Sequence, residues 1–204
     1  MQINNYCFWD MLLEEYNFLG VDYGSKLAGT TVAVFVQNGQ FNIIQSLKKK
    51  NADMMLSGLL EEYAPQDLFI DAPLSLPGAL VGRGEDYFYR KADRLCKAMS
   101  PMFLGAMTAR AIKLKDSFSS IGFYEAYPAG LVREIPGLQA YYDKKKSIRK
   151  AAVDALEQIL PAELNKKPEN WHQYDALLCW MVGYRFKKGE ALAVGDAQEG
   201  LIYI

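Results

Sequence analysis

Four acidic residues occupy positions where acids are rarely found. Asp22 lies in an apolar β-type run, Asp71 ends a second such run, and Glu125 is flanked by aromatic residues. Asp175 lies in an apolar segment with helical spacing and shares a helix face with apolar side chains. A buried carboxylate is costly unless positive charge compensates it, and a divalent cation can compensate several. The four residues therefore indicate a carboxylate metal site, in which two ions about 4 Å apart would assist a phosphoryl displacement.

The other potential metal ligands are scarce. The chain has one histidine, His172, and three widely spaced cysteines, Cys7, Cys96 and Cys179. This composition excludes a multi-histidine site, a zinc–thiolate site and a disulfide framework. Because only oxygen ligands remain, we expect Mg²⁺ or Mn²⁺. His172 precedes Asp175 by three residues, so it is either a proton shuttle on the same helix face or a packed or capping histidine.

Each acid also has a structural interpretation. Asp22 and Asp71 could shape the turns that follow their strands, and Glu125 could pair with a nearby arginine. Asp175 could be stabilised by the dipole of its helix. All four, however, fall at a strand end or a helix start that one crevice could gather, which favours a shared role.

The elements that must position these residues follow from periodicity and turn signals. We expect strands over residues 18–23, 30–36, 41–47, 68–70 and 122–127, and a hairpin over 191–204. We expect helices over residues 53–63, 147–160 and 171–186, and a mostly helical stretch over 78–120 that is broken at Ser100-Pro101.

The order of these elements indicates an α/β fold. An Asn-Gly turn at residues 38–39 joins two of the first three strands into an antiparallel meander. Later strands alternate with helices, which favours parallel pairing through right-handed crossovers. We therefore expect one domain over residues 17–204, with a mixed sheet, flanking helices and a helical insertion, preceded by an extension of residues 1–16.

Five segments in this order resemble a known family. They are GVDYG at 20–24, IDAPLSLP at 70–77, YEAYP at 124–128, HQYDAL at 172–177 and GDAQEGLIYI at 195–204. The combination resembles the predicted ribonuclease H-like nucleases, a largely uncharacterised family related in fold to Holliday-junction resolvases. The resemblance runs from about residue 18 to the C-terminus, and IDAPLSLP is its most specific segment.

This resemblance implies a ribonuclease H-like fold and a metal-dependent nuclease. It implies that Asp22, Asp71 and Asp175 form the acidic metal-binding core, with Glu125 as a fourth member that positions water or an outer ion. Arg90 and Asp93 match a further Arg-x-x-Asp pattern of the family, for which we expect contact with substrate phosphate. The family's activity is itself inferred mostly from fold, so the substrate is open to DNA or RNA.

The basic residues are unevenly distributed although the net charge is only −1. Residues 83–115 contain eight basic and three acidic residues, with Arg94 close to a run of aromatic residues at 87–89. A second basic cluster spans residues 144–150 and begins with Lys144. Such clusters suit phosphate contacts and base stacking, so we expect a nucleic-acid partner and include Arg94 and Lys144 as substrate-binding residues; the alternative is a solvated helix face.

The sequence also bears on three other classes of protein: membrane proteins, non-catalytic binding modules and actin-like kinases. No apolar run approaches the ~20 residues of a membrane helix, so we expect a cytoplasmic protein without a membrane partner. A non-catalytic nucleic-acid or protein-binding module of the same fold is the main alternative to an enzyme. An actin-like ATP-dependent kinase shares a strand Asp-x-Gly motif, but it would need two copies of the fold, and 204 residues are too few.

Overall fold

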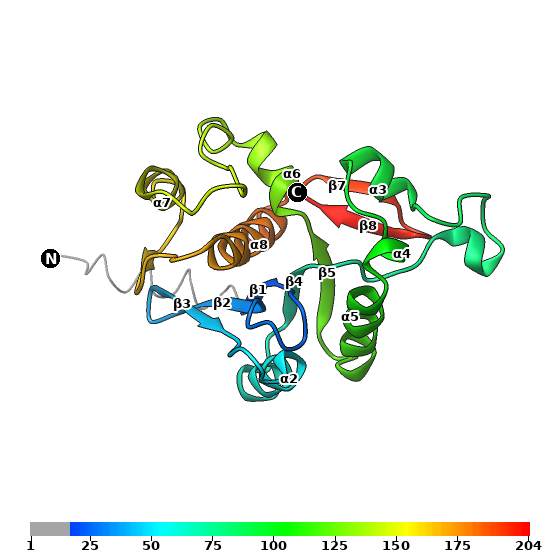
Figure 1. Ribbon diagram of the computed structural model, residues 1–204, viewed down its shortest axis with the longest axis horizontal. Coiled ribbons are helices and arrows are strands. Elements are labelled where there is room, and N and C mark those ends of the chain that lie inside the picture. The colour runs from blue at the N-terminus through cyan, green and yellow to red at the C-terminus, as the bar shows by residue number, and fades with distance from the viewer. Residues whose placement is uncertain (1–16) are drawn as a thin grey trace, which may run out of the picture.

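A computed structural model describes residues 17–204, and the expected extension of residues 1–16 lies outside them. The described residues form one eight-stranded mixed sheet in the order β6-β3-β2-β1-β4-β5-β8-β7, flanked by helices (Figure 1). The strands are β1 (Phe18–Asp22), β2 (Val32–Gln37), β3 (Gln40–Gln45), β4 (Asp67–Asp71), β5 (Gly122–Ala126), β6 (Glu163–Leu164), β7 (Ala193–Asp196) and β8 (Gly200–Tyr203). The α/β class and the mixed sheet are thus confirmed.

The pairing of the strands follows the expected pattern. β1, β2 and β3 form an antiparallel meander whose last turn contains Asn38 and Gly39, both with positive φ. β4 and β5 then add in parallel on the other side of β1. The C-terminal hairpin of β7 and β8 joins β5 through β8, also in parallel.

Helices cover both faces of the sheet. They are α2 (Ala52–Tyr63), α3 (Lys91–Cys96), α4 (Pro101–Leu104), α5 (Ala106–Ser117), α6 (Pro128–Glu134), α7 (Lys150–Glu157) and α8 (Trp171–Lys187), with a 3₁₀ helix, η1 (Gly78–Val81). α2 and α5 lie on one face, and α8 crosses the other with α6 and α7 near it (Figure 1).

Alternation along β1 assigns its side chains to these two layers. Phe18 packs in the core formed with α8, whereas Leu19 and Val21 pack in the core formed with α2 and α5. On β4, Phe69 faces α8 and Ile70 faces the other layer. Because successive side chains of a strand point to opposite faces, residues two positions on from Phe18 and Phe69 also face α8.

Gly20 allows α8 to approach the sheet closely. A Cβ atom placed on Gly20 would lie 2.2 Å from the backbone nitrogen of Trp180 and 2.7 Å from the carbonyl oxygen of Ala176. Only glycine therefore fits between β1 and this part of α8. The close contact brings the first turns of α8 directly over the end of β1.

Two short elements were missed, and the insertion is less regular than expected. No element was expected directly after the strand over residues 122–127, but Pro128 occupies the first turn of α6, where proline is favoured because its missing N–H is not needed. β6 has only two residues and so carries no periodicity. The stretch over 78–120 contains three short helices followed by the longer α5, with the expected break where Ser100 caps α4.

Within residues 17–204, no helix has both the length and the apolar character that crossing a bilayer requires.

Candidate metal centre

Three of the four expected carboxylates meet at one end of the sheet. Asp22 and Asp71 end the neighbouring parallel strands β1 and β4 and are direct partners in register. Both follow the alternation that faces α8, and Asp175 lies in the second turn of that helix. One carboxylate oxygen from each residue lies within 4.8 Å of the other two, so we call Asp22, Asp71 and Asp175 the carboxylate triad.

The three carboxylates differ in their partners. Asp22 and Asp175 are buried, and Asp71 is partly buried. His172 Nδ1 lies 2.7 Å from Asp22 Oδ2, and the hydroxyl of Tyr142 donates to Asp175 Oδ1 at 2.7 Å. Within residues 17–204, no group forms a hydrogen bond or ion pair with the carboxylate of Asp71.

The shifted pKa values reflect this crowding. Burial, followed by the negative charges of Asp22 and Asp175, raises the pKa of Asp71 well above its usual range. Burial also raises the pKa of Asp175 to about 6, although the nearby Lys144 opposes the shift. The unneutralised charge of the triad is therefore held at an energetic cost that a bound cation would remove.

Lys144 places an ammonium group on the triad. Its Nζ forms an ion pair with Asp175 Oδ2, while its side chain remains 47% exposed. Burial lowers the pKa of Lys144, but the charges of Asp175, Asp71 and Asp22 outweigh that effect and raise it overall. Lys144 and Tyr142 both belong to the loop between α6 and α7, which we call the α6–α7 loop (residues 135–149).

His172 lies at the other side of the site, in the first turn of α8. The contact between its Nδ1 and Asp22 raises the pKa of His172, and its side chain is 45% exposed. His172 therefore contacts the triad from the solvent side and neither packs in the core nor caps α8, whose N-cap is Asn170; a proton shuttle at the triad stays a prediction.

Glu125 does not join the triad. It is in register with Ile70 on β4, and its neighbours Tyr124 and Ala126 pack in the layer of α8. Alternation therefore directs the side chain of Glu125 to the opposite face from Asp22 and Asp71. Glu125 instead accepts two hydrogen bonds from Arg90, at 2.7 and 2.8 Å, which is the arginine pairing weighed above as the structural alternative.

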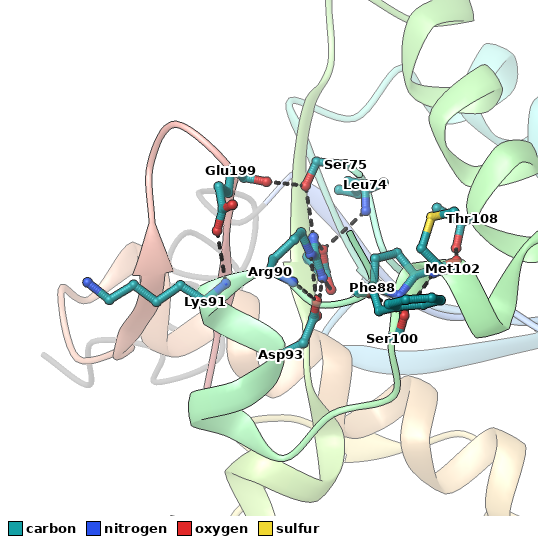
Figure 2. A network of polar contacts seen from close by, with 12 residues as sticks. Leu74, Ser75, Phe88, Arg90, Lys91, Asp93, Ser100, Met102, Thr108 and Glu199 are labelled. Carbon is teal, nitrogen blue, oxygen red and sulfur yellow. Dashed lines mark hydrogen bonds and ion pairs between the residues drawn. The ribbon is translucent and has the colours of Figure 1, made fainter. Parts of the chain in front are cut away.

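Arg90 is the centre of a buried polar network (Figure 2). Its guanidinium donates two hydrogen bonds to Glu125, two to Asp93 and one to the hydroxyl of Ser75. These five bonds use all the N–H donors of an arginine side chain. Burial lowers the pKa of Arg90, but the paired carboxylates outweigh burial and raise it overall.

This network leaves no donor of Arg90 for a phosphate. The side chains of Arg90 and Asp93 are both 0% exposed, so the phosphate contact expected of these two residues is not available in this structure. Their observed role is to join α3 to β5. Ser75 and Glu199, which the quoted motifs contain but to which no role was assigned, extend the network to the C-terminal hairpin (Figure 2).

The other two residues expected to contact substrate, Arg94 and Lys144, are exposed, unlike Arg90 and Asp93. Arg94 is exposed and forms an ion pair with Asp86 at 2.8 Å, and its guanidinium lies over the ring of Tyr89. Lys144 lies at the triad itself. Nearby, the rest of the second basic cluster is exposed, namely Lys145, Lys146, Arg149 and Lys150.

A cleft of about 210 Å³ opens beside the triad. Asp22, Asp71 and Glu125 contribute to its wall, together with Met99 and Met107 from the insertion. The cleft therefore combines a carboxylate side and an apolar side.

Tyr142 is the contact of the triad that sequence reasoning missed. The only signal available in the sequence was its position two residues before the basic cluster that begins with Lys144.

The donor set fits a hard divalent cation. Three carboxylates offer oxygen ligands at close range, and Asp71 has no hydrogen-bond or ion-pair partner among the described residues. These residues could hold a metal ion. Searches of protein-family models and of curated proteins returned no match to this chain.

Proposed function

We propose that this protein is a metal-dependent nuclease that hydrolyses phosphodiester bonds in nucleic acid, with Mg²⁺ or Mn²⁺ bound by Asp22, Asp71 and Asp175. One observation carries the proposal: Asp71, a carboxylate without a partner among the described residues, faces two further carboxylates at the edge of a cleft. Like charges gathered in this way are costly unless protonation or a cation neutralises them, and a divalent cation neutralises more than the single Lys144 ammonium.

The chain's own residues prepare the ligands. His172 orients Asp22, and Tyr142 orients Asp175, so two of the three carboxylates are fixed before a cation arrives. A divalent cation held by these residues would supply Lewis-acid polarisation of a phosphoryl oxygen. The exposed basic residues 144–150 lie beside the triad and offer a positive surface to a polyanionic chain.

The fold is consistent with this proposal. The meander of β1 to β3 followed by the parallel strands β4 and β5 matches the sheet expected from the resemblance to ribonuclease H-like nucleases. We therefore propose that family for the chain. The role of Glu125 is revised within the proposal, because this residue anchors Arg90 and does not reach the triad.

The test is a nuclease assay on single-stranded, double-stranded and branched DNA and RNA, with Mn²⁺, with Mg²⁺ and with EDTA. Outer-sphere partners of metal ligands are typically worth about 10–100-fold in activity. We therefore expect Asp71→Asn to lose at least about a hundredfold. Asp116→Asn is the matched control, because Asp116 is exposed near the end of α5, away from the triad.

Equal activity of Asp71→Asn and the wild type would refute the proposal. Mn²⁺ binding without cleavage of any of these substrates would favour the non-catalytic module.

A further inference from the structure

We propose that the carboxylate triad takes a single divalent cation, and that the ammonium group of Lys144 occupies the place of a second one. This inference rests on the proposed metal site and concerns how many ions it holds. It departs from the two-ion arrangement that the acids alone indicate.

The first argument is the number of ligand oxygens that remain available. Tyr142 donates to Oδ1 of Asp175 and Lys144 pairs with its Oδ2, so both oxygens of this carboxylate are engaged. One oxygen of Asp22 is engaged by His172. Asp71 and the second oxygen of Asp22 remain, on the two neighbouring strand ends. The oxygens without a partner among the described residues therefore suit one ion between β1 and β4, which Asp175 can still bind through a remaining lone pair, better than two ions that share all three residues.

The second argument is the charge balance. The three carboxylates carry three negative charges and the Lys144 ammonium one positive charge, so two negative charges remain. One divalent cation neutralises them. Two divalent cations together with the ammonium would place five positive charges against three negative ones, at separations where like charges repel strongly. A protonated His172 would add to this excess.

The third argument is that Lys144 is held in place. On one side of it, Tyr142 contacts Asp175 and its ring packs against Trp171 at 5.4 Å between centroids. On the other side, Trp171 Nε1 donates to the carbonyl oxygen of Lys146 at 2.6 Å. The α6–α7 loop is therefore tied to the start of α8 both before and after Lys144, which directs this lysine at the triad.

The fourth argument comes from the neighbouring lysines. Lys145 and Lys146 are also exposed, but the described ion pair of Lys146 is with Asp143, on the surface of the loop. Only Lys144 of this run forms an ion pair with the triad within the described residues. A polybasic loop that merely binds phosphate would not need one lysine directed at the metal ligands.

The experiment is isothermal titration of the full chain with Mn²⁺, supported by electron paramagnetic resonance of the bound ions. We compare the wild type with Lys144→Met, Lys144→Arg and the matched control Lys145→Met. For the wild type we expect one Mn²⁺ per chain and no spin coupling between ions. For Lys144→Met we expect two Mn²⁺ per chain, with the first bound on the order of tenfold more tightly.

The controls should behave as the wild type. Lys144→Arg keeps the positive charge, and Lys145→Met removes a charge from the same loop but not from the triad, so both should bind one ion.

Different outcomes separate this inference from the proposed function. Two coupled ions in the wild type would overturn the single-ion inference and leave the metal site intact. Unchanged stoichiometry and affinity in Lys144→Met would also overturn it. Absence of Mn²⁺ binding to the wild type would refute the metal site itself, and this inference with it. The wild-type measurement decides the question even if a variant folds poorly.

Discussion

Replacing Asp71 by asparagine should stabilise the metal-free protein. The carboxylate of Asp71 has no partner among the described residues and faces the charges of Asp22 and Asp175. Asparagine is similar in size and removes the charge, so it relieves the repulsion without leaving a cavity. A residue retained for stability would show the opposite effect.

The magnitude follows from the separation of the charges. At 4.8 Å, the limit for the triad oxygens, two unit charges repel by about 3.5 kcal/mol at an effective dielectric constant of about 20. Two such neighbours act on Asp71, and the Lys144 ammonium offsets roughly one of them. Solvent screening and relaxation reduce the remaining ~3 kcal/mol, so we expect Asp71→Asn to gain about 1–3 kcal/mol in EDTA at pH 8.

The gain should depend on pH. Burial and the charges of Asp22 and Asp175 raise the pKa of Asp71 in the folded protein above the value of about 3.9 in the unfolded chain. The folded state therefore binds more protons between these two values, and wild-type stability falls as pH rises through this window. The advantage of Asp71→Asn should consequently be small at about pH 4 and should grow as pH rises through the folded-state pKa of Asp71.

The assay is urea unfolding followed by tryptophan fluorescence, at several pH values, in EDTA and in excess Mn²⁺. Mn²⁺ stabilises only the protein that binds it, so the order of the two proteins should reverse: the variant is more stable in EDTA and the wild type in Mn²⁺. The control Asp116→Asn should be as stable as the wild type both in EDTA and in Mn²⁺. Lower stability of Asp71→Asn in EDTA at pH 8 would show that the charge of Asp71 is already compensated and would refute the reasoning.

Three further substitutions test how the site is supported. Gly20→Ala places a Cβ against the backbone of α8 and should lower the free energy of unfolding by at least about 3 kcal/mol. Gly58→Ala is the control, because a Cβ at Gly58 in α2 meets open space, and it should raise the free energy of unfolding by about 0.5–1 kcal/mol. Equal effects of the two substitutions would contradict the close packing of β1 and α8. Arg90→Met leaves two buried carboxylates without their cation and should lower the free energy of unfolding, measured in urea, by about 3–5 kcal/mol. Arg94→Met removes an exposed ion pair and should lower it by no more than about 1 kcal/mol. Tyr142→Phe removes one hydrogen bond to the triad and should weaken Mn²⁺ binding by about 10–100-fold in calorimetry; unchanged affinity would show that the hydroxyl does not orient its carboxylate.

Local patterns were sufficient to predict most of the sheet. The β-branched strands and the Asn-Gly turn carry their own signals, and the expected meander and C-terminal hairpin are both present. α6 was missed because Pro128 directly follows the expected strand over residues 122–127, although proline is also favoured in the first turn of a helix. Two-residue β6 depends on its pairing with β3 and has no local signal.

In the candidate site, the meeting of two acids could be predicted from the sequence, but the orientation of a third could not. Asp22 and Asp71 end neighbouring strands at the same level, so an acid at each strand end was enough to suggest that they meet. Glu125 also lies near a strand end, but it is in register with Ile70 and therefore points to the other face. The register between strands that are distant in the sequence decides to which face of the sheet each acid points, and a single sequence does not reveal this register.

The pairing of Arg90 was also beyond local reasoning. Two of its donors bind Asp93, only three residues on, but the other three bind residues of β5 and of the segment after β4, which meet Arg90 only in the folded chain. A surface-like cluster of basic residues thus included one buried arginine with a structural role.

The position of α8 late in the chain has a consequence during synthesis on the ribosome. Asp22 and Asp71 emerge early, but the third carboxylate is on α8, which also covers the sheet face where β1 and β4 end. A nascent chain that stops before α8 has neither a closed core on that face nor a complete set of ligands. The triad therefore forms only once nearly the whole fold can close, so that an incomplete chain does not yet bring the three carboxylates together.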